Sequence, residues 1–385
     1  MFDFDQIHDR RASDCYKWNR YPDDVLPLWV ADMDFMSPPE VLKALEERVH
    51  HGLFGYGDPD PELTDLIVER LHQRYGWQVK PEHIIYQPGV GSALNTVCKA
   101  IGKAGDGVLV QTPVYPPFLS AVEYQDRRLL VNPLKPVVDE RELRYEIDFD
   151  HFADLINDRT RLFMLCNPQN PSGRVFSQDE LTRMADLCMA KGVVMCSDEI
   201  HCELLLGDRV HQPLAALSPE IAEHTITFMA PSKTFNLAGL RLSFAVVQNA
   251  DLRKRLQRAA RGLVASPDVL AYPAAKAAYA SGGRWLEALL QYLRANRNHV
   301  TEFLRTALPE LRSTVPEATF LTWIDCRDAD IPGDPYRFFV DQARLALNDG
   351  QAFGPGGEGF VRLNFGCPRQ TLDQALNRMY AALRR

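Results

Sequence analysis

Three polar side chains in this sequence each follow a short apolar run, and together they could do chemistry. Asn170 comes shortly after the run 160–166, Asp198 ends the next run, and Lys233 follows the run 224–230. Runs of this length predict strands, and an open α/β sheet binds its ligands at the carboxyl ends of its strands. An amine that forms a Schiff base and a carboxylate that holds a pyridinium nitrogen are what pyridoxal phosphate requires of a protein. The sequence therefore predicts a pyridoxal phosphate site at one sheet edge.

Each of these three side chains has an expected role and a plainer alternative. Lys233 would hold the cofactor through its amine and, when released, act as the general base at the substrate Cα. Most lysines are surface residues, but apolar residues flank this one on both sides. Asp198 would keep the pyridine nitrogen protonated, although a carboxylate at that position could equally cap a helix. Asn170 would donate to the phenolate oxygen of the cofactor, and its Pro-Ser-Gly neighbours also indicate a turn.

A second group of residues could bind the phosphate and the ring of the cofactor. Residues 89–92 (Gly-Val-Gly-Ser) precede a predicted helix, so the backbone N–H groups of Val90 and Gly91 and the helix dipole can receive a phosphate. This motif matches neither of the standard glycine-rich phosphate loops and is weak by itself. Arg241 could add a charge-assisted hydrogen bond. Tyr115 could stack on the pyridine ring, although a lone aromatic is more often a core residue.

The elements that must position these residues can be outlined from the same sequence. Ser177 and Glu180 form a predicted capping box for the helix that follows them. Ser37 is predicted to cap an earlier helix that ends near residue 51. From residue 83 onward helical patterns alternate with β-rich runs, and strands are predicted at 107–112, 160–166, 192–197, 224–230 and 242–248. Alternation of this kind predicts a mostly parallel sheet covered by helices, which is an α/β fold.

The length of the chain indicates more than one domain. At 385 residues it exceeds one ordinary hydrophobic core. After about residue 280 the pattern changes to a long helical stretch, separate strands and a final helix, which indicates a smaller α+β unit. We therefore expect an N-terminal segment (1–45) that packs with the small domain, a large cofactor-binding domain (46–282) and a small C-terminal domain (283–385).

Composition argues against several classes of protein. A net charge of −8 disfavours nucleic acid as a partner, because nucleic acid is bound through clustered Lys and Arg. No apolar run approaches the ~20 residues of a membrane helix, and the first residues, Met-Phe-Asp-Phe-Asp-Gln, do not resemble a secretory signal. Eight cysteines without a Cys-x-x-Cys pair predict reduced thiols and a cytoplasmic protein. Ten histidines without zinc-type spacing predict no metal site.

Four segments make the sequence recognisable. They are Trp-Val-Ala-Asp-Met-Asp-Phe (29–35), Asp-Glu-Ile-His (198–201), Ala-Pro-Ser-Lys-Thr-Phe-Asn-Leu-Ala-Gly (230–239) and Arg-Leu-Asn-Phe-Gly-Cys-Pro-Arg (362–369). Over nearly its whole length the chain resembles the fold-type I, aspartate-aminotransferase-like pyridoxal phosphate enzymes. The four segments are similar, more specifically, to the MalY/PatB group of cystathionine β-lyases and cysteine-S-conjugate β-lyases. The resemblance implies a large domain with a mostly parallel sheet and a smaller α+β domain.

The resemblance also implies how substrate is bound. Arg362 would bind the substrate α-carboxylate with two parallel hydrogen bonds, helped by the backbone at Ala31 and by Asn170. Tyr56 matches a tyrosine that reaches the phosphate and the substrate of the neighbouring subunit. The active unit would therefore be a homodimer with a shared active site.

Two further cofactor contacts follow from the resemblance. His201 stands where many aminotransferases have a tyrosine near the phenolate oxygen of the cofactor. Ala230 stands where aminotransferases often have a phosphate-binding serine, and Ser232 is expected to take that role. Gly91 and Ser92 depart from the bulkier, proline-containing residues of this group, which alters the expected shape of the phosphate loop.

The implied function is that of a C–S β-lyase. It would act on L-cystathionine or a related L-cysteine S-conjugate and release a thiol, pyruvate and ammonia. The chemistry of the site does not by itself choose elimination, because an aminotransferase would use the same residues. A third alternative is a regulatory partner of another protein, since some relatives in this group bind a transcription activator. The presence of both Lys233 and Asp198 favours an enzyme.

Overall fold

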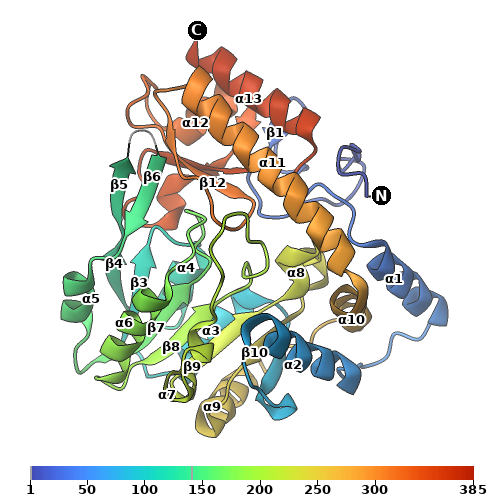
Figure 1. The fold of residues 1–385 in the computed structure, drawn as a ribbon, viewed down its shortest axis with the longest axis vertical. Coiled ribbons are helices and arrows are strands. Elements are labelled where there is room, and N and C mark those ends of the chain that lie inside the picture. The colour runs from blue at the N-terminus through green and yellow to red at the C-terminus, as the bar shows by residue number, and fades with distance from the viewer. Residues whose placement is uncertain (1, 140–141) are drawn as a thin grey trace.

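A seven-stranded sheet forms the centre of the computed structural model, which describes residues 2–139 and 142–385 (Figure 1). β10 is antiparallel to both of its neighbours, β9 and β2, whereas the other neighbouring strands run parallel. In spatial order the strands are β2 (Ile84–Gln87), β10 (Ser243–Val246), β9 (Thr225–Met229), β8 (Val194–Asp198), β7 (Thr160–Cys166), β3 (Gly107–Thr112) and β4 (Arg128–Pro133). The predicted α/β fold with a mostly parallel sheet is confirmed.

Helices cover both faces of this sheet. One face packs on α3 (Val90–Ala100), α4 (Pro117–Tyr124) and α9 (Ala250–Ala260). The other face packs on α5 (Phe149–Leu155), α6 (Gln178–Met189) and α7 (Pro219–Glu223). Burial on both faces is the reason that the central strands read as continuous apolar runs.

A second sheet of six strands gathers the C-terminal part of the chain. Its strands, in spatial order, are β14 (Asn348–Asp349), β15 (Phe360–Asn364), β12 (Leu321–Asp325), β11 (Arg312–Ser313), β6 (Glu142–Glu146) and β5 (Lys135–Asp139). β5 and β6 come from the middle of the chain, and β6 joins β11 in parallel. Neither was predicted, because the strand that stabilises them lies far along the sequence.

The N-terminal segment lies against the C-terminal elements. β1 (Leu26–Pro27) pairs with β13 (Leu345–Ala346). Phe4, Met33 and Phe35 belong to the same buried cluster as residues of the C-terminal helices. The remaining helices are α1 (Pro39–His51), α2 (Pro61–Tyr75), α10 (Ala271–Ser281), α11 (Gly283–Ala307), α12 (Pro335–Asp341) and α13 (Arg369–Leu383). Within the described residues, no helix is both long and apolar enough to cross a membrane.

One of the two predicted helix caps is confirmed and the other is wrong. Ser177 and Glu180 form the expected capping box at the start of α6. Ser37 does not cap α1, because that helix begins after Pro38 without a side-chain cap. The Ser37 hydroxyl instead donates to the Asn236 carbonyl at 3.1 Å. A tertiary contact has therefore replaced the local one.

Candidate active site

Neighbouring strand ends meet at one edge of the central sheet and carry the predicted polar residues. Asp198 ends β8 and pairs in register with Cys166 at the end of β7. β9, the other parallel neighbour of β8, leads into the short helix α8 (Pro231–Thr234), which carries Lys233. Asn170 lies in the loop after β7. Parallel pairing thus places the carboxyl ends of these strands together.

These side chains line one cavity of about 250 Å³. Seven predicted site residues line it, namely Ala31, Tyr115, Asn170, Asp198, His201, Lys233 and Arg362. The other lining residues are Tyr16, Trp29, Val30, Cys166, Ile200 and Asn348. Trp29 and Val30 could have been anticipated from the segment 29–35. Tyr16 and Asn348 carry no signal in the sequence, because only the packing of distant segments brings them here.

Lys233 presents an amine of reduced basicity to this cavity. Its Nζ donates to the Ala31 carbonyl oxygen at 2.6 Å. Burial lowers the pKa of Lys233 to about 8, and the Arg362 charge acts in the same direction. The carboxylates of Asp32 and Asp198 oppose this shift. A substantial fraction of Lys233 is therefore neutral, and able to accept a proton, in mildly alkaline solution.

Asp198 is a buried carboxyl group that has no charged hydrogen-bond partner in the part of the chain that the structure describes. It accepts a hydrogen bond from the Ile200 N–H at 3.3 Å, which is a turn contact; no helix begins here, so Asp198 is not the helix cap of the plainer alternative. Burial raises the pKa of Asp198 to about 7, and the Ile200 hydrogen bond and the Lys233 charge offset it only in part. A cationic N–H donor in the cavity would complete the partners of this carboxylate.

His201 and Tyr115 add two neutral polar groups to the cavity. The His201 ring is buried, and its Nδ1 has no hydrogen-bond partner in the described part of the chain. Burial, with the nearby Lys233 and Arg362 charges, holds the pKa of His201 well below its usual range. Burial also raises the pKa of Tyr115, so its phenol keeps its proton. Both side chains can therefore donate or accept a hydrogen bond toward a ligand.

Arg362 is a buried cation whose hydrogen bonds go to neutral oxygen atoms. Its Nη1 donates to Asn170 Oδ1 at 2.9 Å, and its Nη2 donates to the Trp29 carbonyl at 2.7 Å and to Asn348 Oδ1. Its Nε has no partner within the described residues. Burial lowers the pKa of Arg362 to about 10. A carboxylate that enters the cavity would supply the missing counter-ion.

The predicted phosphate contacts lie along the same sheet edge. Gly89 precedes α3 with a left-handed φ of 113°, so Val90 and Gly91 occupy the first turn of the helix. The pairing of Gln87 with Ser243 brings the start of α3 close to the exposed Arg241. Exposed backbone N–H groups at a helix start and a nearby guanidinium can together bind a phosphate.

The structure does not bring every predicted residue to the cavity. Val90, Gly91, Ser232, Arg241 and Tyr56 are not among the lining residues. Tyr56 is 112% exposed and lies in an irregular segment between α1 and α2. These five assignments therefore remain predictions.

A mostly parallel sheet that brings a lysine, an aspartate and an asparagine to one cavity, with an arginine from a second sheet, defines an enzyme of the aminotransferase type. Residues 23–379 match the family described as aminotransferase class I and II. The chain belongs to that family.

Three relatives place the chain more narrowly. It is 40% identical to the cystathionine β-lyase PatB of Bacillus subtilis, over 99% of each chain. It is 32% identical to the protein MalY of Escherichia coli, over 100% of this chain and 99% of MalY. The crystal structure of cystalysin from Treponema denticola, which contains pyridoxal 5'-phosphate, has a TM-score of 0.95 and 31% identity over 100% of this chain and 99% of the other. The expected membership of the group that contains PatB and MalY is confirmed.

Proposed function

We propose that this protein is a pyridoxal-phosphate-dependent C–S β-lyase. It cleaves L-cystathionine or a related L-cysteine S-conjugate to a thiol, pyruvate and ammonia. The observation that supports this best is one cavity lined by Lys233, Asp198 and Arg362, in a chain 40% identical to a cystathionine β-lyase over its full length. The same cavity could serve transamination, so the choice of elimination rests on that relative.

The cavity fits the cofactor through its own unsatisfied groups. Among the described residues, Asp198 has no hydrogen-bonded cation, which a protonated pyridine nitrogen would provide, and His201 Nδ1 has no partner. Lys233 would hold the cofactor covalently. The residues proposed to bind the ring and phosphate are Asn170, His201, Tyr115, Val90, Gly91, Ser232 and Arg241. Pyridoxal phosphate, when bound, supplies an electron sink for the charge that develops at the substrate Cα.

Each side chain in the cavity would then have a separate role in the reaction. Arg362 binds the substrate α-carboxylate and fixes the orientation of Cα. Lys233, with its pKa lowered to about 8, removes the Cα proton. The Cβ–S bond breaks with its electron pair on sulfur, and the departing sulfur takes up a proton equivalent to the one that Lys233 removed from Cα. Water then hydrolyses the released imine to pyruvate and ammonia. Asp198 remains ionised and would keep the pyridine nitrogen of the cofactor protonated.

One assay separates the lyase from the aminotransferase. The purified protein, loaded with pyridoxal phosphate, is incubated with L-cystathionine and, separately, with an amino donor plus a 2-oxo acid. Pyruvate, ammonia and a new thiol in equal amounts are expected from the first reaction. A new amino acid from the second reaction, without thiol from the first, would replace the lyase by an aminotransferase.

Arg362→Lys tests the carboxylate contact. Lysine cannot reproduce two parallel hydrogen bonds to a carboxylate, so kcat/KM should fall by ~10- to 100-fold for every amino-acid substrate, or roughly 1.4–2.7 kcal/mol. Cofactor affinity should hardly change. The matched control is Arg327→Lys, because Arg327 is paired with Asp325 outside the cavity. If Arg362→Lys lowers only the melting temperature, then Arg362 is a structural residue.

The active unit is proposed to be a homodimer with shared sites. Support comes from the segment between α1 and α2, where Leu53, Phe54 and Tyr56 expose large apolar surfaces. A contiguous exposed apolar patch commonly marks an interaction surface. Tyr56 of one subunit would reach the phosphate and substrate in the other.

Hybrid dimers test the shared site. When Tyr56→Phe and Lys233→Ala subunits are mixed, one site of each hybrid should carry both lesions and the other site neither. The intact site should restore activity to about half of the wild-type value per hybrid, because each dimer has two sites. A mixture no more active than the average of its parents would place both residues in the same subunit's site.

A cytoplasmic location is proposed on the state of the thiols. All eight cysteines are free, and seven of them are buried. Reduced cysteines are typical of a reducing compartment. Titration of unfolded, unreduced protein should find eight thiols. Fewer than eight would contradict the proposed reduced state of the cysteines.

A further inference from the structure

One residue of the second sheet, Asn364, binds alternate carbonyl groups of residues 28–33, which are here named the bridging segment. Asn364, at the end of β15, donates through its backbone N–H to the Leu28 carbonyl at 2.9 Å. Its side-chain Nδ2 donates to the carbonyls of Val30 at 2.5 Å and Asp32 at 2.7 Å. Its Oδ1 accepts from the Gly366 N–H at 2.7 Å. Asn364 is therefore fully used and, at 1% exposure, buried.

Two of the other carbonyl groups of the bridging segment, those of Trp29 and Ala31, accept from side chains that line the cavity. The Trp29 carbonyl accepts from Arg362 at 2.7 Å, and the Ala31 carbonyl accepts from Lys233 at 2.6 Å. The Met33 carbonyl accepts from Asn236 at 2.9 Å. Successive groups of an extended chain point to opposite sides. Two carbonyls two residues apart thus hold the proposed base and the proposed carboxylate-binding group.

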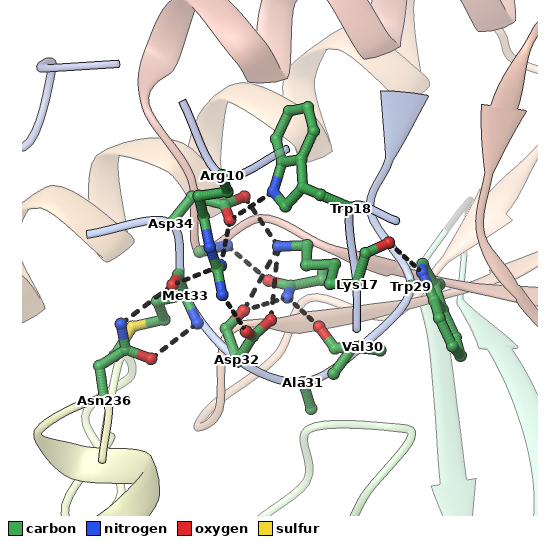
Figure 2. Close-up of polar contacts among 12 residues, drawn as sticks. Arg10, Lys17, Trp18, Trp29, Val30, Ala31, Asp32, Met33, Asp34 and Asn236 are labelled. Atoms are coloured by element: carbon green, nitrogen blue, oxygen red, sulfur yellow. Dashed lines mark hydrogen bonds and ion pairs between the residues drawn. The ribbon is translucent and has the colours of Figure 1, made fainter. Parts of the chain in front are cut away.

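A charge cluster with a buried ion pair, Lys17 with Asp34, and two half-buried members, Arg10 and Asp32, fixes the far end of the bridging segment. Asp34 accepts from Lys17 at 2.7 Å, from Arg10 at 2.5 Å and from the Trp18 indole at 2.9 Å. Asp32 accepts from Arg10 at 2.8 Å. Figure 2 shows Arg10, Lys17 and Trp18 converging on Asp32 and Asp34, while the Ala31 side chain points away from them. Two cations and two carboxylates balance, so the cluster anchors the segment without adding net charge beside the cavity.

We propose that Asn364 is a positioning residue that sets the spacing between the Lys233 amine and the Arg362 guanidinium. It does so by holding the carbonyls of Val30 and Asp32, so that the intervening carbonyls face Lys233 and Arg362. Leu28 bonds to the backbone of Ala346 and Asn364, but residues 29–33 pair with no strand in the described part of the chain. Side-chain hydrogen bonds must therefore supply the rigidity that a sheet would otherwise give. This proposal depends on the proposed function in one respect: the kcat/KM that is measured is that for the cleavage of L-cystathionine.

The test compares two buried asparagines that make the same kind of contact. Asn364→Ala removes the side-chain hydrogen bonds to the carbonyls of Val30 and Asp32, and leaves the Asp32 carbonyl only the long contact from Lys17 at 3.5 Å. Asn296→Ala is the matched control, because Asn296 is also buried and its Nδ2 donates to the carbonyls of Phe365 and Cys367 and to none of residues 28–33. Three quantities are measured on each cofactor-loaded variant: the melting temperature, the Kd of L-alanine from the absorption of the bound cofactor, and kcat/KM for L-cystathionine per bound cofactor.

Asn364→Ala should raise the Kd of L-alanine by ~10-fold and lower kcat/KM by ~10- to 100-fold, because a displacement of about 1 Å in a reacting group is costly. Asn296→Ala should lose thermal stability while both constants stay within about threefold of the wild type. Equal changes in both variants, or an unchanged Kd in Asn364→Ala, would overturn the proposal. If Asn364→Ala does not fold, Asn364→Ser, which keeps one donor, is judged by the same criterion.

The L-alanine measurement separates this proposal from the proposed function. L-Alanine has an α-carboxylate but no leaving group at Cβ, so its binding does not depend on elimination. If the wild-type protein binds L-alanine but does not cleave cystathionine, the proposed lyase activity is contradicted. The role of Asn364 is then decided by the Kd of L-alanine in Asn364→Ala compared with Asn296→Ala.

Discussion

Lys233→Ala should lower kcat/KM by about 10⁴-fold or more, because the variant loses the covalent attachment of the cofactor and the base at Cα together. The amine of Lys233 lies in the same cavity as Asp198 and Arg362. Pyridoxal phosphate should also wash out of the variant on dialysis. The measurements are steady-state kinetics with L-cystathionine and the absorption spectrum before and after dialysis.

The control for this prediction is Lys191→Ala, since Lys191 is exposed and follows α6 on the surface. It should keep both the absorption band and the kinetics of the wild type. Turnover by Lys233→Ala within tenfold of the wild type would remove Lys233 from the chemistry. A wild-type protein that takes up no pyridoxal phosphate would contradict the cofactor as well.

Asp198→Ala should lower kcat/KM by ~10²- to 10³-fold without loss of stability. In an enclosed site, the loss of one fixed electrostatic partner typically costs ~2.7–4 kcal/mol of transition-state stabilisation. The folded protein without cofactor should be as stable as the wild type or more so. Within residues 2–139 and 142–385, Asp198 is buried with a single turn hydrogen bond, and burial raises its pKa to about 7, so its removal relieves an unfavourable burial.

The neighbouring Glu199 provides a control, because its replacement should lower stability whereas that of Asp198 should not. It is buried and accepts from the Ser197 hydroxyl at 2.8 Å and the Leu214 N–H at 3.0 Å, and it pairs with His211 at 2.8 Å. Glu199→Ala should therefore lower the melting temperature, because it leaves these partners unsatisfied. Melting of the apo-protein and kcat/KM of the loaded protein distinguish the two variants. If Asp198→Ala loses stability and keeps its kinetics, Asp198 is a structural residue.

Local patterns in the sequence predicted the central sheet and the part of the site that depends on it. Buried parallel strands need continuous apolar runs. Such runs can be recognised in the sequence without knowing which strands lie beside them in the sheet. The polar residues that end these runs, Asp198 and Lys233 among them, necessarily meet at one edge once the strands are parallel. Arg362 and Ala31 were predicted only through the family resemblance. The sequence around them contains no strand pattern that would place them at the edge of the central sheet.

Other contacts were decided by the tertiary structure alone. Asn348 and Tyr16 enter the cavity from segments that have no common periodicity with the central strands. Ser37 reads locally as a helix cap, but its hydroxyl bonds to Asn236, almost two hundred residues away. Local hydrogen-bonding preferences are weak compared with the burial of a packed segment, so they yield where a distant partner is available.

The sequence by itself thus determined the class of fold, the strand ends and the residue types that can carry the chemistry. The spacing between Lys233 and Arg362 was decided only in three dimensions, where Asn364 and the bridging segment hold them through alternate carbonyl groups. Backbone carbonyls are common to every residue, so no sequence pattern marks which of them will accept these bonds. Their direction depends on the path of the chain, which the packing of the N-terminal segment against β15 sets.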